Sequence, residues 1–382
     1  MSCEVFPEPP SGDIPDLIPA QSNRIAPSAS SLAQLTTIGV GAKIGRYVEA
    51  FTREELIDVI RQADEAQIPL LVLGGGSNIL ASDEPFDGIV VRDMRVGCET
   101  VMEDGCGGAQ MRALGGTPWD DVVRYAIEHE WRGLEALSGI PGAVGAAPVQ
   151  NIGAYGQELS DTFAAATTYD RQTGEIKTLF LSDMKFAYRD SILKQSIPQW
   201  GYSPRWIVLD VLFHMLRGSM SLPIKYGQLA SALGVDVGQS APAWQVRETV
   251  LALRAGKGMI LNDSDRDTYS CGSFFTNPIL SADAAAQLPP DAPRYPAPEG
   301  MVKTSAAWLI DNAGFHKGFA IGENASLSTK HTLALTNRGQ ATGDDIRALA
   351  RHIRDGVRQT YGVDLQPEPV VLGSGLDTIN EN

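Results

Sequence analysis

The chain has 382 residues, of which 43% are hydrophobic and 20% charged, so it is long enough for two or three domains with their own apolar cores. Its 31 basic and 46 acidic residues give a net charge of −15, which argues against a broad phosphate-backbone contact, so we expect no nucleic-acid partner. The four cysteines and five histidines show neither a disulfide framework nor metal-ligand spacing, so we expect a reducing compartment and no catalytic metal.

The first segment, residues 1–31, is rich in proline, serine and acidic residues and has little periodicity, which predicts a mobile N-terminal extension. It contains no basic and apolar stretch typical of a secretory signal, and no later stretch qualifies as a membrane span. We therefore expect a cytoplasmic protein that does not contact a membrane.

A β-α-β pattern opens the ordered chain. Residues 46–51 alternate as a strand, and Thr52 with Glu55 forms a capping box that begins a helix. An apolar strand at 69–73 runs directly into a glycine-rich loop at 74–78, and a further strand is expected at 89–92. The pattern predicts an α+β or α/β unit with a glycine loop at the end of a strand.

A second unit is expected from about residue 96. Thr117 as N-cap and Pro118 at the first helical position predict a helix through Trp131. Residues 169–176 are typical of a hairpin, and 206–214 of a strand buried on both faces. A third unit follows a helix at 245–255 that is expected to end at Gly256, and it includes a long helix capped by Thr342 and Asp345.

The stretch 136–157 holds five glycines, two prolines and no charged residue. Pro141, Pro148 and the glycines argue against a membrane helix. Glycine lets the backbone approach a ligand closely and present its amides, so a ligand-binding surface is one interpretation. A tightly packed turn of the core is the other, and the residues alone do not decide between them.

The loop at 74–78, GlyGlyGlySerAsn, could wrap a pyrophosphate with its amides. It matches neither the dinucleotide fingerprint nor the P-loop, and a triple glycine alone is more often a turn than a site. Two glycine-rich segments in one chain, one suited to phosphates and one flat and apolar, favour a dinucleotide that carries an isoalloxazine ring.

Several motifs, taken in order, resemble one family. They are ThrThrIleGlyValGly (36–41), LeuGlyGlyGlySerAsnIleLeu (73–80), the charge-free segment around 142–156, TyrArgAspSer (188–191), TyrGly (226–227), GlySerPhePheThrAsnPro (272–278) and ProGluPro (367–369). The chain resembles the UDP-N-acetylenolpyruvoylglucosamine reductases (UDP-N-acetylmuramate dehydrogenases) from about Leu35 to Gly373, in the branch whose substrate loop contains a tyrosine.

The resemblance implies an α+β fold, with a two-subdomain FAD-binding fold of the vanillyl-alcohol oxidase type and a third α+β substrate-binding domain. We expect FAD-binding subdomain 1 at 32–95, joined by 364–382, FAD-binding subdomain 2 at 96–262, and the substrate-binding domain at 263–363. FAD is expected to be non-covalent, because neither glycine-rich segment contains His or Cys. The cofactor-binding positions implied are Gly74, Gly75, Gly76, Ser77, Asn78, Gly142, Gly145, Asn151 and Gly153.

The implied reaction reduces the enolpyruvyl ether of UDP-N-acetylglucosamine to the lactyl ether in peptidoglycan precursor synthesis, with NADPH as the reductant of FAD. Hydride from flavin N5 to the vinyl terminus leaves an enolate, which needs a cation at its carboxylate and a proton donor at the α-carbon. By resemblance, Arg189 binds the carboxylate, Ser273 donates the proton, and Glu368 lies beside the enolate. Without the family, these residues would be assigned to an ion pair, a turn and a loop.

The resemblance also places Tyr226 and Lys257 at the UDP diphosphate and Asn277 near the sugar or phosphates. A helix-end lysine favoured by the macrodipole is the alternative interpretation of Lys257. The family implies a monomer acting on small molecules, with a Tyr226 loop that closes over the nucleotide. Cys271, two residues before the implied acid, is expected to be a buried packing thiol.

Two other functions stay open at this point. One is an FAD-dependent alcohol oxidase or dehydrogenase on the same scaffold, in which Arg189 and Ser273 would have no purpose. The other is a non-catalytic module that binds flavin or a nucleotide sugar.

Overall fold

The structure, a computed structural model, describes residues 28–105, 108–373 and 376. Most of the predicted N-terminal extension, residues 1–27, lies outside this range. The packed part of the chain begins a few residues before the predicted boundary at residue 31. Ala29 and Leu32 are buried, and the amide of Ile44 donates to the carbonyl of Ser30 over 3.0 Å. No described helix has the length and apolar character that crossing a membrane requires.

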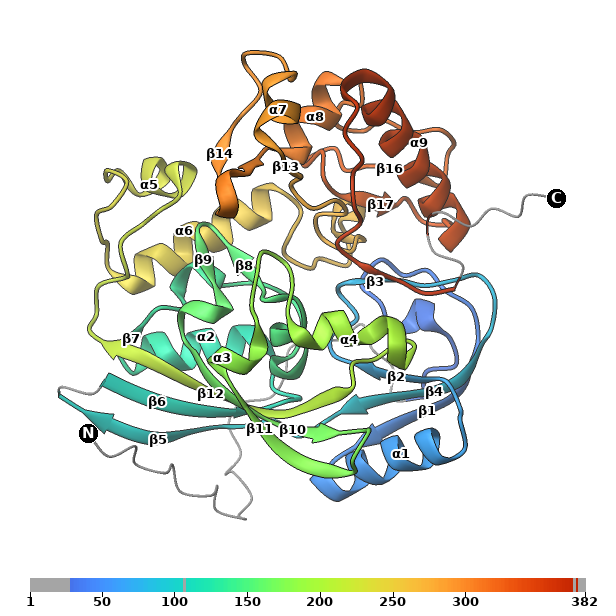
Figure 1. The fold of residues 1–382 in the computed structure, drawn as a ribbon, viewed down its shortest axis with the longest axis vertical. Helices are drawn as coiled ribbons and strands as arrows, with labels where there is room; N and C mark the ends of the chain where they lie inside the picture. The colour runs from blue at the N-terminus through green and yellow to red at the C-terminus, as the bar shows by residue number, and fades with distance from the viewer. Residues whose placement is uncertain (1–27, 106–107, 374–375, 377–382) are drawn as a thin grey trace.

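A small parallel sheet begins the fold (Figure 1). Its strand order is β1 (Ile44–Ala50), β4 (Phe86–Asp93) and β2 (Leu70–Leu73). The predicted capping box of Thr52 and Glu55 is confirmed and opens α1 (Arg53–Glu65). The helix buries Leu56 and Ile60 against this sheet, as its periodicity predicted. Beside the sheet, β3 (Ile79–Leu80) pairs in parallel with β18 (Val370–Val371), which brings the end of the chain back to the glycine loop.

A larger antiparallel sheet extends across the lower part of the molecule in Figure 1. The predicted hairpin and long strand are confirmed as β10, β11 and β12, and β12 is buried continuously from Ile207 to Val211. The order is β11 (Glu175–Phe180), β10 (Phe163–Asp170), β12 (Trp206–Arg217), β6 (Gly108–Leu114) and β5 (Cys98–Asp104), with β7 (Trp131–Arg132) on β12.

Helices and short strands complete the second unit. The helices are α2 (Trp119–Glu128), α3 (Leu181–Met184), α4 (Ile192–Trp200), α5 (Gly227–Leu233) and α6 (Ala243–Gly256), and a hairpin of β8 (Gly153–Ala154) and β9 (Gln157–Glu158) stands beside them. The helix predicted from Thr117 through Trp131 was wrong at both ends, because α2 ends at Glu128 and Trp131 lies in β7. Pro118, not Thr117, is the N-cap of α2, because the Thr117 hydroxyl instead bonds the backbone of Gly97. The predicted end of the next helix at Gly256 is confirmed, because Gly256 is the last residue of α6; the left-handed glycine that follows is Gly258.

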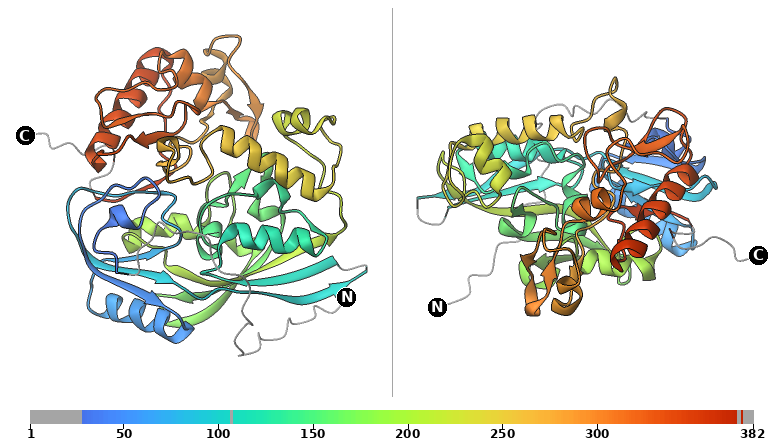
Figure 2. Two further views of the ribbon diagram at one scale, coloured as in Figure 1. Left: turned by 180° about the vertical axis from the view of Figure 1, so that it is seen from behind. Right: turned by 90° about the horizontal axis from the view of Figure 1, so that it is seen from above.

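The third unit lies above the two sheets in Figure 1 and in the left view of Figure 2. Its helices are α7 (Ala282–Ala286), α8 (Ala306–Asn312) and α9 (Gly343–Tyr361), and its strands are β13 (Ile279–Leu280), β14 (Tyr295–Pro296), β15 (Val302–Lys303), β16 (Ala325–Leu327) and β17 (Leu335–Asn337). The predicted cap of α9 by Thr342 and Asp345 is confirmed, and Ile346, Leu349, Ile353 and Val357 are fully buried.

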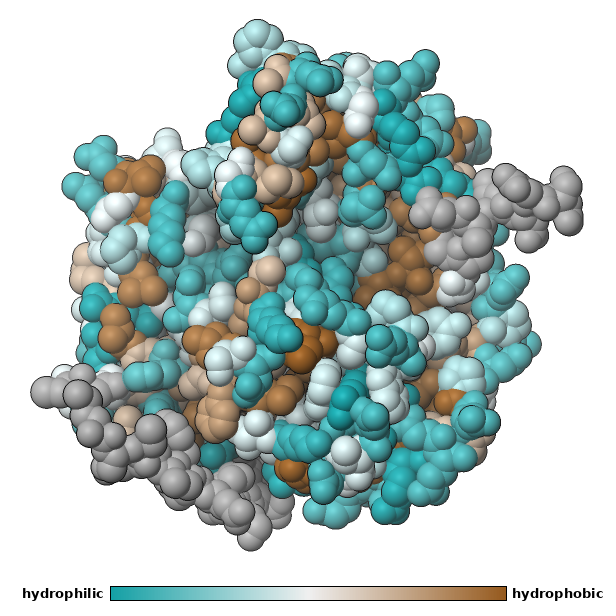
Figure 3. Space-filling model, viewed as in Figure 1, coloured by the Kyte–Doolittle hydropathy of each residue, from teal (hydrophilic) through white to brown (hydrophobic). Residues whose placement is uncertain are grey.

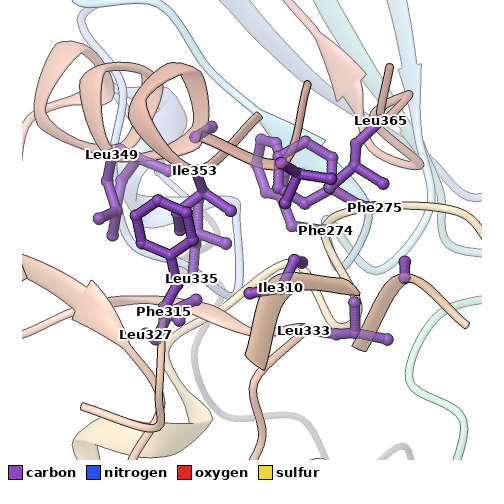
Figure 4. Packing of buried hydrophobic residues seen from close by; sticks show 14 of the residues in the cluster. Phe274, Phe275, Ile310, Phe315, Leu327, Leu333, Leu335, Leu349, Ile353 and Leu365 are labelled. Carbon is purple, nitrogen blue, oxygen red and sulfur yellow. The ribbon is translucent and has the colours of Figure 1, made fainter. Parts of the chain in front are cut away.

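The core of the third unit holds the chain on either side of the predicted acid. Phe274 and Phe275 point into the cluster formed by α8, α9 and β16–β17, where Leu333 and Leu365 also lie (Figure 4). Ile38 and Leu80 from the first unit belong to the same cluster. The chain that follows the glycine loop and the chain on either side of the predicted acid therefore share one hydrophobic core.

Candidate active site

A pocket of about 770 Å³ lies where the three units meet. Its wall carries residues from the glycine loop, the charge-free segment, the Arg189 turn and the third unit. The basic lining residues are Arg189, Lys194, Lys225, Arg254, Lys257 and Lys303, and the acidic ones are Glu158, Asp161 and Glu368. A pocket with twice as many cations as anions, in a chain of net charge −15, favours an anionic ligand.

The two glycine-rich segments contact each other in this wall. A Cβ added at Gly75 would lie 2.7 Å from the Cα of Gly142, so only glycine permits this approach. The Ser77 hydroxyl donates to the carbonyl of Pro141 over 3.0 Å, and the Asn78 amide donates to the Gln150 side chain over 2.6 Å. The polar side chains of the loop therefore join the two segments.

The backbone amides of the glycine loop are left for a ligand. Among the described residues, the N–H groups of 74–78 donate to no acceptor, although this loop lines the pocket. Backbone amides without partners are costly when buried, and grouped amides form a concave site for anions. The loop therefore has the donors that a pyrophosphate requires.

Two predicted cofactor positions do not line the pocket. Gly145 donates its amide to Gly115, and a Cβ there would lie 3.2 Å from the Gly115 carbonyl, so Gly145 packs against the sheet instead. The Asn151 side chain donates to Glu158 and Ala187 and accepts from the amide of Ser160. Sequence could not separate these packing positions from Gly142 and Gly153, which do line the pocket.

Arg189 enters the pocket from a strained turn. Its φ is +56°, a left-handed conformation that is uncommon for a residue with a side chain. The Lys194 ammonium donates to the Arg189 carbonyl over 3.0 Å, and burial lowers the pKa of Lys194. The guanidinium donates from Nε to Glu368 over 3.0 Å and from Nη2 to the Gly153 carbonyl over 2.7 Å. Among the described residues, Nη1 has no hydrogen-bond partner.

Ser273 and Glu368 are placed by the peptide groups of Phe274. The Phe274 amide donates to the Leu333 carbonyl over 2.7 Å, and its carbonyl accepts from the Glu368 amide over 2.8 Å. Three chain segments therefore lie side by side, with Ser273 on the middle one. Its hydroxyl lies 3.4 Å from Nε2 of His331, which is two residues before Leu333.

The predicted substrate residues form a second group in the pocket. Tyr226 is 43% exposed, and its ring meets that of Tyr155 edge-on at 5.7 Å. The Lys257 ammonium lies 5.6 Å from the centre of the Tyr155 ring and donates to Gln228 over 2.8 Å. Burial lowers the pKa of Lys257, and the positive charge of Arg254 lowers it further. An anion bound beside Lys257 would raise this pKa again, because it favours the charged ammonium form.

Asn277 links the third unit to the Arg189 turn. Its side-chain oxygen accepts a hydrogen bond from the backbone amide of Ala306 at the start of α8. Its backbone amide donates to the Tyr188 hydroxyl over 3.3 Å. The Lys303 ammonium lies 4.8 Å from the centre of the Tyr188 ring. Sequence reasoning missed four residues of the pocket wall. Tyr155 lies in the charge-free motif but was given no role, and Arg254, Lys303 and His331 are isolated residues of common types outside the quoted motifs.

Cys271 is the buried thiol that we predicted. It is 4% exposed, donates to the Ile79 carbonyl over 3.0 Å, and burial raises its pKa to about 12. The thiol form therefore dominates at neutral pH, which disfavours its reaction as a nucleophile.

Comparison with known proteins identifies the family. The family described as "UDP-N-acetylenolpyruvoylglucosamine reductase, C-terminal domain" matches residues 264–372, and that described as "FAD binding domain" matches 45–179. The chain is 49% identical to a UDP-N-acetylenolpyruvoylglucosamine reductase of Cutibacterium acnes, over 90% of this chain and 89% of that protein. It belongs to the UDP-N-acetylenolpyruvoylglucosamine reductase family.

Other relatives agree with this assignment. A UDP-N-acetylenolpyruvoylglucosamine reductase of Thermobifida fusca is 46% identical, over 90% of this chain and 97% of that protein. The crystal structure of the UDP-N-acetylenolpyruvylglucosamine reductase of Thermus caldophilus superposes with a TM-score of 0.59 at 25% identity, over 90% of this chain and 97% of that one. The predicted α+β class, with an FAD-binding fold of the vanillyl-alcohol oxidase type and a further C-terminal domain, is confirmed. The chain is an oxidoreductase of a flavoprotein family.

Proposed function

We propose that this chain is an FAD-containing, NADPH-dependent reductase that converts UDP-N-acetylglucosamine enolpyruvate to UDP-N-acetylmuramate in peptidoglycan precursor synthesis. The observation that carries the proposal is the joining of Ser273 and Glu368 through the Phe274 peptide groups, with Arg189 bound to Glu368. These residues come from three distant segments, and no stability argument requires them to meet in one pocket. The names of the relatives support the substrate.

The pocket wall fits FAD. The amides of 74–78 would hold the pyrophosphate, and the charge-free backbone at Gly142 and Gly153 would lie along the flavin. When bound, FAD supplies a carrier that takes a hydride from NADPH and delivers it to the vinyl carbon of the enolpyruvyl ether. The raised pKa of Cys271 supports a non-covalent cofactor. The proposed units are FAD-binding subdomains at 32–95 with 364–382 and at 96–262, and a substrate-binding domain at 263–363.

Arg189 would anchor the substrate carboxylate. Its Nε and Nη2 groups are held by Glu368 and Gly153, which fixes the plane of the guanidinium and leaves Nη1 for the substrate. A guanidinium held in this way would stabilise negative charge that develops on the enolpyruvyl group. Glu368, held beside Arg189, would lie against the same group.

Lys257, Tyr226 and Asn277 would bind the nucleotide part of the substrate. A diphosphate beside Lys257 and Arg254 would offset the burial of both cations, whose pKa values are lowered by that burial. The exposed Tyr226 ring would close over this group.

Ser273 would complete the reduction by protonating the α-carbon. The Ser273 O–H bond breaks, its electron pair stays on Oγ, and the enolate electron pair forms the new C–H bond. The alkoxide then takes a proton from water. Because serine is a weak acid, this step requires a donor beside Oγ that stabilises the alkoxide.

The half-reactions of Ser273→Ala test the proposal. The purified variant should be yellow, and NADPH should bleach its flavin absorbance at the wild-type rate. Anaerobic addition of the enolpyruvyl substrate should restore the absorbance rapidly in the wild type and only very slowly in the variant. Equally rapid recovery in both proteins would remove Ser273 from this role, and substrate-dependent peroxide formation would instead support an alcohol oxidase.

A further inference from the structure

His331 lies outside the sequence motifs, yet its side chain contacts Ser273. Its Nε2 lies 3.4 Å from the Ser273 hydroxyl, and its ring lines the pocket. We propose that His331 is a positioning residue whose Nε2–H group donates a hydrogen bond to Ser273 Oγ and stabilises the alkoxide left by proton transfer. This inference rests on the proposed function, because it assigns a partner to the proposed proton donor.

The direction of the hydrogen bond follows from the task of Ser273. If the serine hydroxyl donated to His331, its proton would point at the imidazole and away from the substrate α-carbon. A proton donor to carbon must therefore receive this hydrogen bond and not give it. The proposal accordingly requires the tautomer of His331 that carries its hydrogen on Nε2.

The backbone keeps the two residues in register. The Phe274 amide donates to the Leu333 carbonyl, so the chain after Ser273 runs beside the chain after His331. The His331 amide donates to the hydroxyl of Ser328, which is fully buried, over 3.3 Å. This contact is therefore built into the core shown in Figure 4, where Phe274 and Leu333 lie together.

The surroundings of His331 suit a fixed donor and not a proton carrier. Burial first, then the positive charges of Lys257, Lys317 and Arg254, lower its pKa to about 4. No carboxylate is among these charged neighbours, so the neutral ring is the stable form at neutral pH. A neutral imidazole can donate from Nε2 without giving up its proton.

The contact distance fits a bond that tightens during the reaction. At 3.4 Å it is a long hydrogen bond to a neutral hydroxyl. When Oγ becomes an alkoxide, the bond becomes charge-assisted, and such bonds are shorter and roughly twice as strong as neutral ones. His331 therefore favours the state after proton transfer more than the state before it.

Two variants of the full-length protein with FAD bound test this inference. His331→Gln keeps an N–H donor but cannot act as a base, whereas His331→Phe removes the donor and keeps a ring of similar size. We expect recovery of the flavin absorbance by the enolpyruvyl substrate to slow by about 10²-fold or more in His331→Phe, as with loss of one preorganised donor. In His331→Gln it should slow far less, and bleaching by NADPH should stay at the wild-type rate in both.

The matched control is His316→Phe, at an exposed histidine of the same unit, which should leave both half-reactions unchanged. Wild-type recovery in His331→Phe would overturn the inference, as would a loss in His331→Gln as large as in His331→Phe. If the flavin absorbance of the wild-type protein did not recover with the enolpyruvyl substrate, the proposed function itself would be wrong. That outcome is distinct from failure of the His331 proposal, which requires recovery in the wild type.

The tautomer can also be measured in the wild-type protein without turnover. Nitrogen-15 histidine spectra of the wild-type protein, assigned with the His331→Gln protein, should show a neutral His331 with hydrogen on Nε2 throughout the neutral pH range. A hydrogen on Nδ1, or a charged ring at neutral pH, would overturn the inference.

Discussion

Gly75→Ala tests whether contact between the two glycine-rich segments creates the cofactor wall. The new Cβ would lie 2.7 Å from the Cα and 3.1 Å from the nitrogen of Gly142, and neither atom can turn away as a flexible side chain would. The φ of Gly75 is outside the left-handed region, so the added atom itself is the whole perturbation. The two segments must therefore separate by several tenths of an ångström or more.

Overpacking of this kind costs about 1–3 kcal/mol. If this free energy is lost entirely from the binding of FAD, the dissociation constant of FAD rises by about 5- to 140-fold. Any part that falls on the core instead lowers the melting temperature of the apoprotein. Fluorescence titration of the apoprotein with FAD and a thermal melt of the same sample measure the two parts.

The control is Gly322→Ala, because a Cβ at Gly322 meets no atom within 4 Å and its φ is not left-handed. It should change neither FAD affinity nor melting temperature. Wild-type affinity together with wild-type melting in Gly75→Ala would refute the close contact between Gly75 and Gly142 on which our description of the wall depends.

Three further predictions concern the side chains around the site. Lys194→Met removes the donor to the Arg189 carbonyl. Loss of a charged hydrogen bond of about 1.5–3 kcal/mol should lower kcat/KM for the enolpyruvyl substrate by about 10- to 100-fold, and the rate of flavin bleaching by NADPH should not change. An unaltered kcat/KM would show that the Arg189 turn keeps its conformation without Lys194. Because the pKa of His331 is about 4 when folded and 6.5 ordinarily, only the unfolded chain gains its proton as pH falls from 6.5 towards 4, so stability is lost over this window. His331→Gln should flatten that part of the melting profile against pH, and an identical slope in both proteins would contradict the lowered pKa. Cys271 and Cys98, whose pKa values burial raises to about 12, should resist alkylation at neutral pH until denaturant is added, and peptide mapping that finds either modified in the folded protein would contradict their burial.

The elements that sequence predicted well are those with local causes. The capping boxes at Thr52 and Thr342, the turn between β10 and β11, and the buried faces of α1 and α9 all depend on neighbouring residues. The start of α2 was displaced by one residue because Thr117 finds a tertiary partner, Gly97, that no local pattern reveals.

The site was predictable only where motifs carried it. Arg189, Ser273 and Glu368 lie in quoted motifs, and the structure brings their segments together through Phe274 and the Arg189–Glu368 ion pair. Sequence gave no reason to place His331 beside Ser273, because that contact depends on the pairing of two segments 58 residues apart. It also could not show that Gly145 and Asn151 pack behind the pocket wall.

The face shown in Figure 3 is mostly hydrophilic, and its hydrophobic residues form small separate groups.

The absorption spectrum of the purified wild-type protein, recorded anaerobically before and after NADPH and then after UDP-N-acetylglucosamine enolpyruvate, tests the central claim most directly. We predict a flavin spectrum that NADPH bleaches and the enolpyruvyl substrate restores, with formation of UDP-N-acetylmuramate. A colourless protein that does not take up added FAD, or a bleached flavin that this substrate leaves unchanged, would contradict the account.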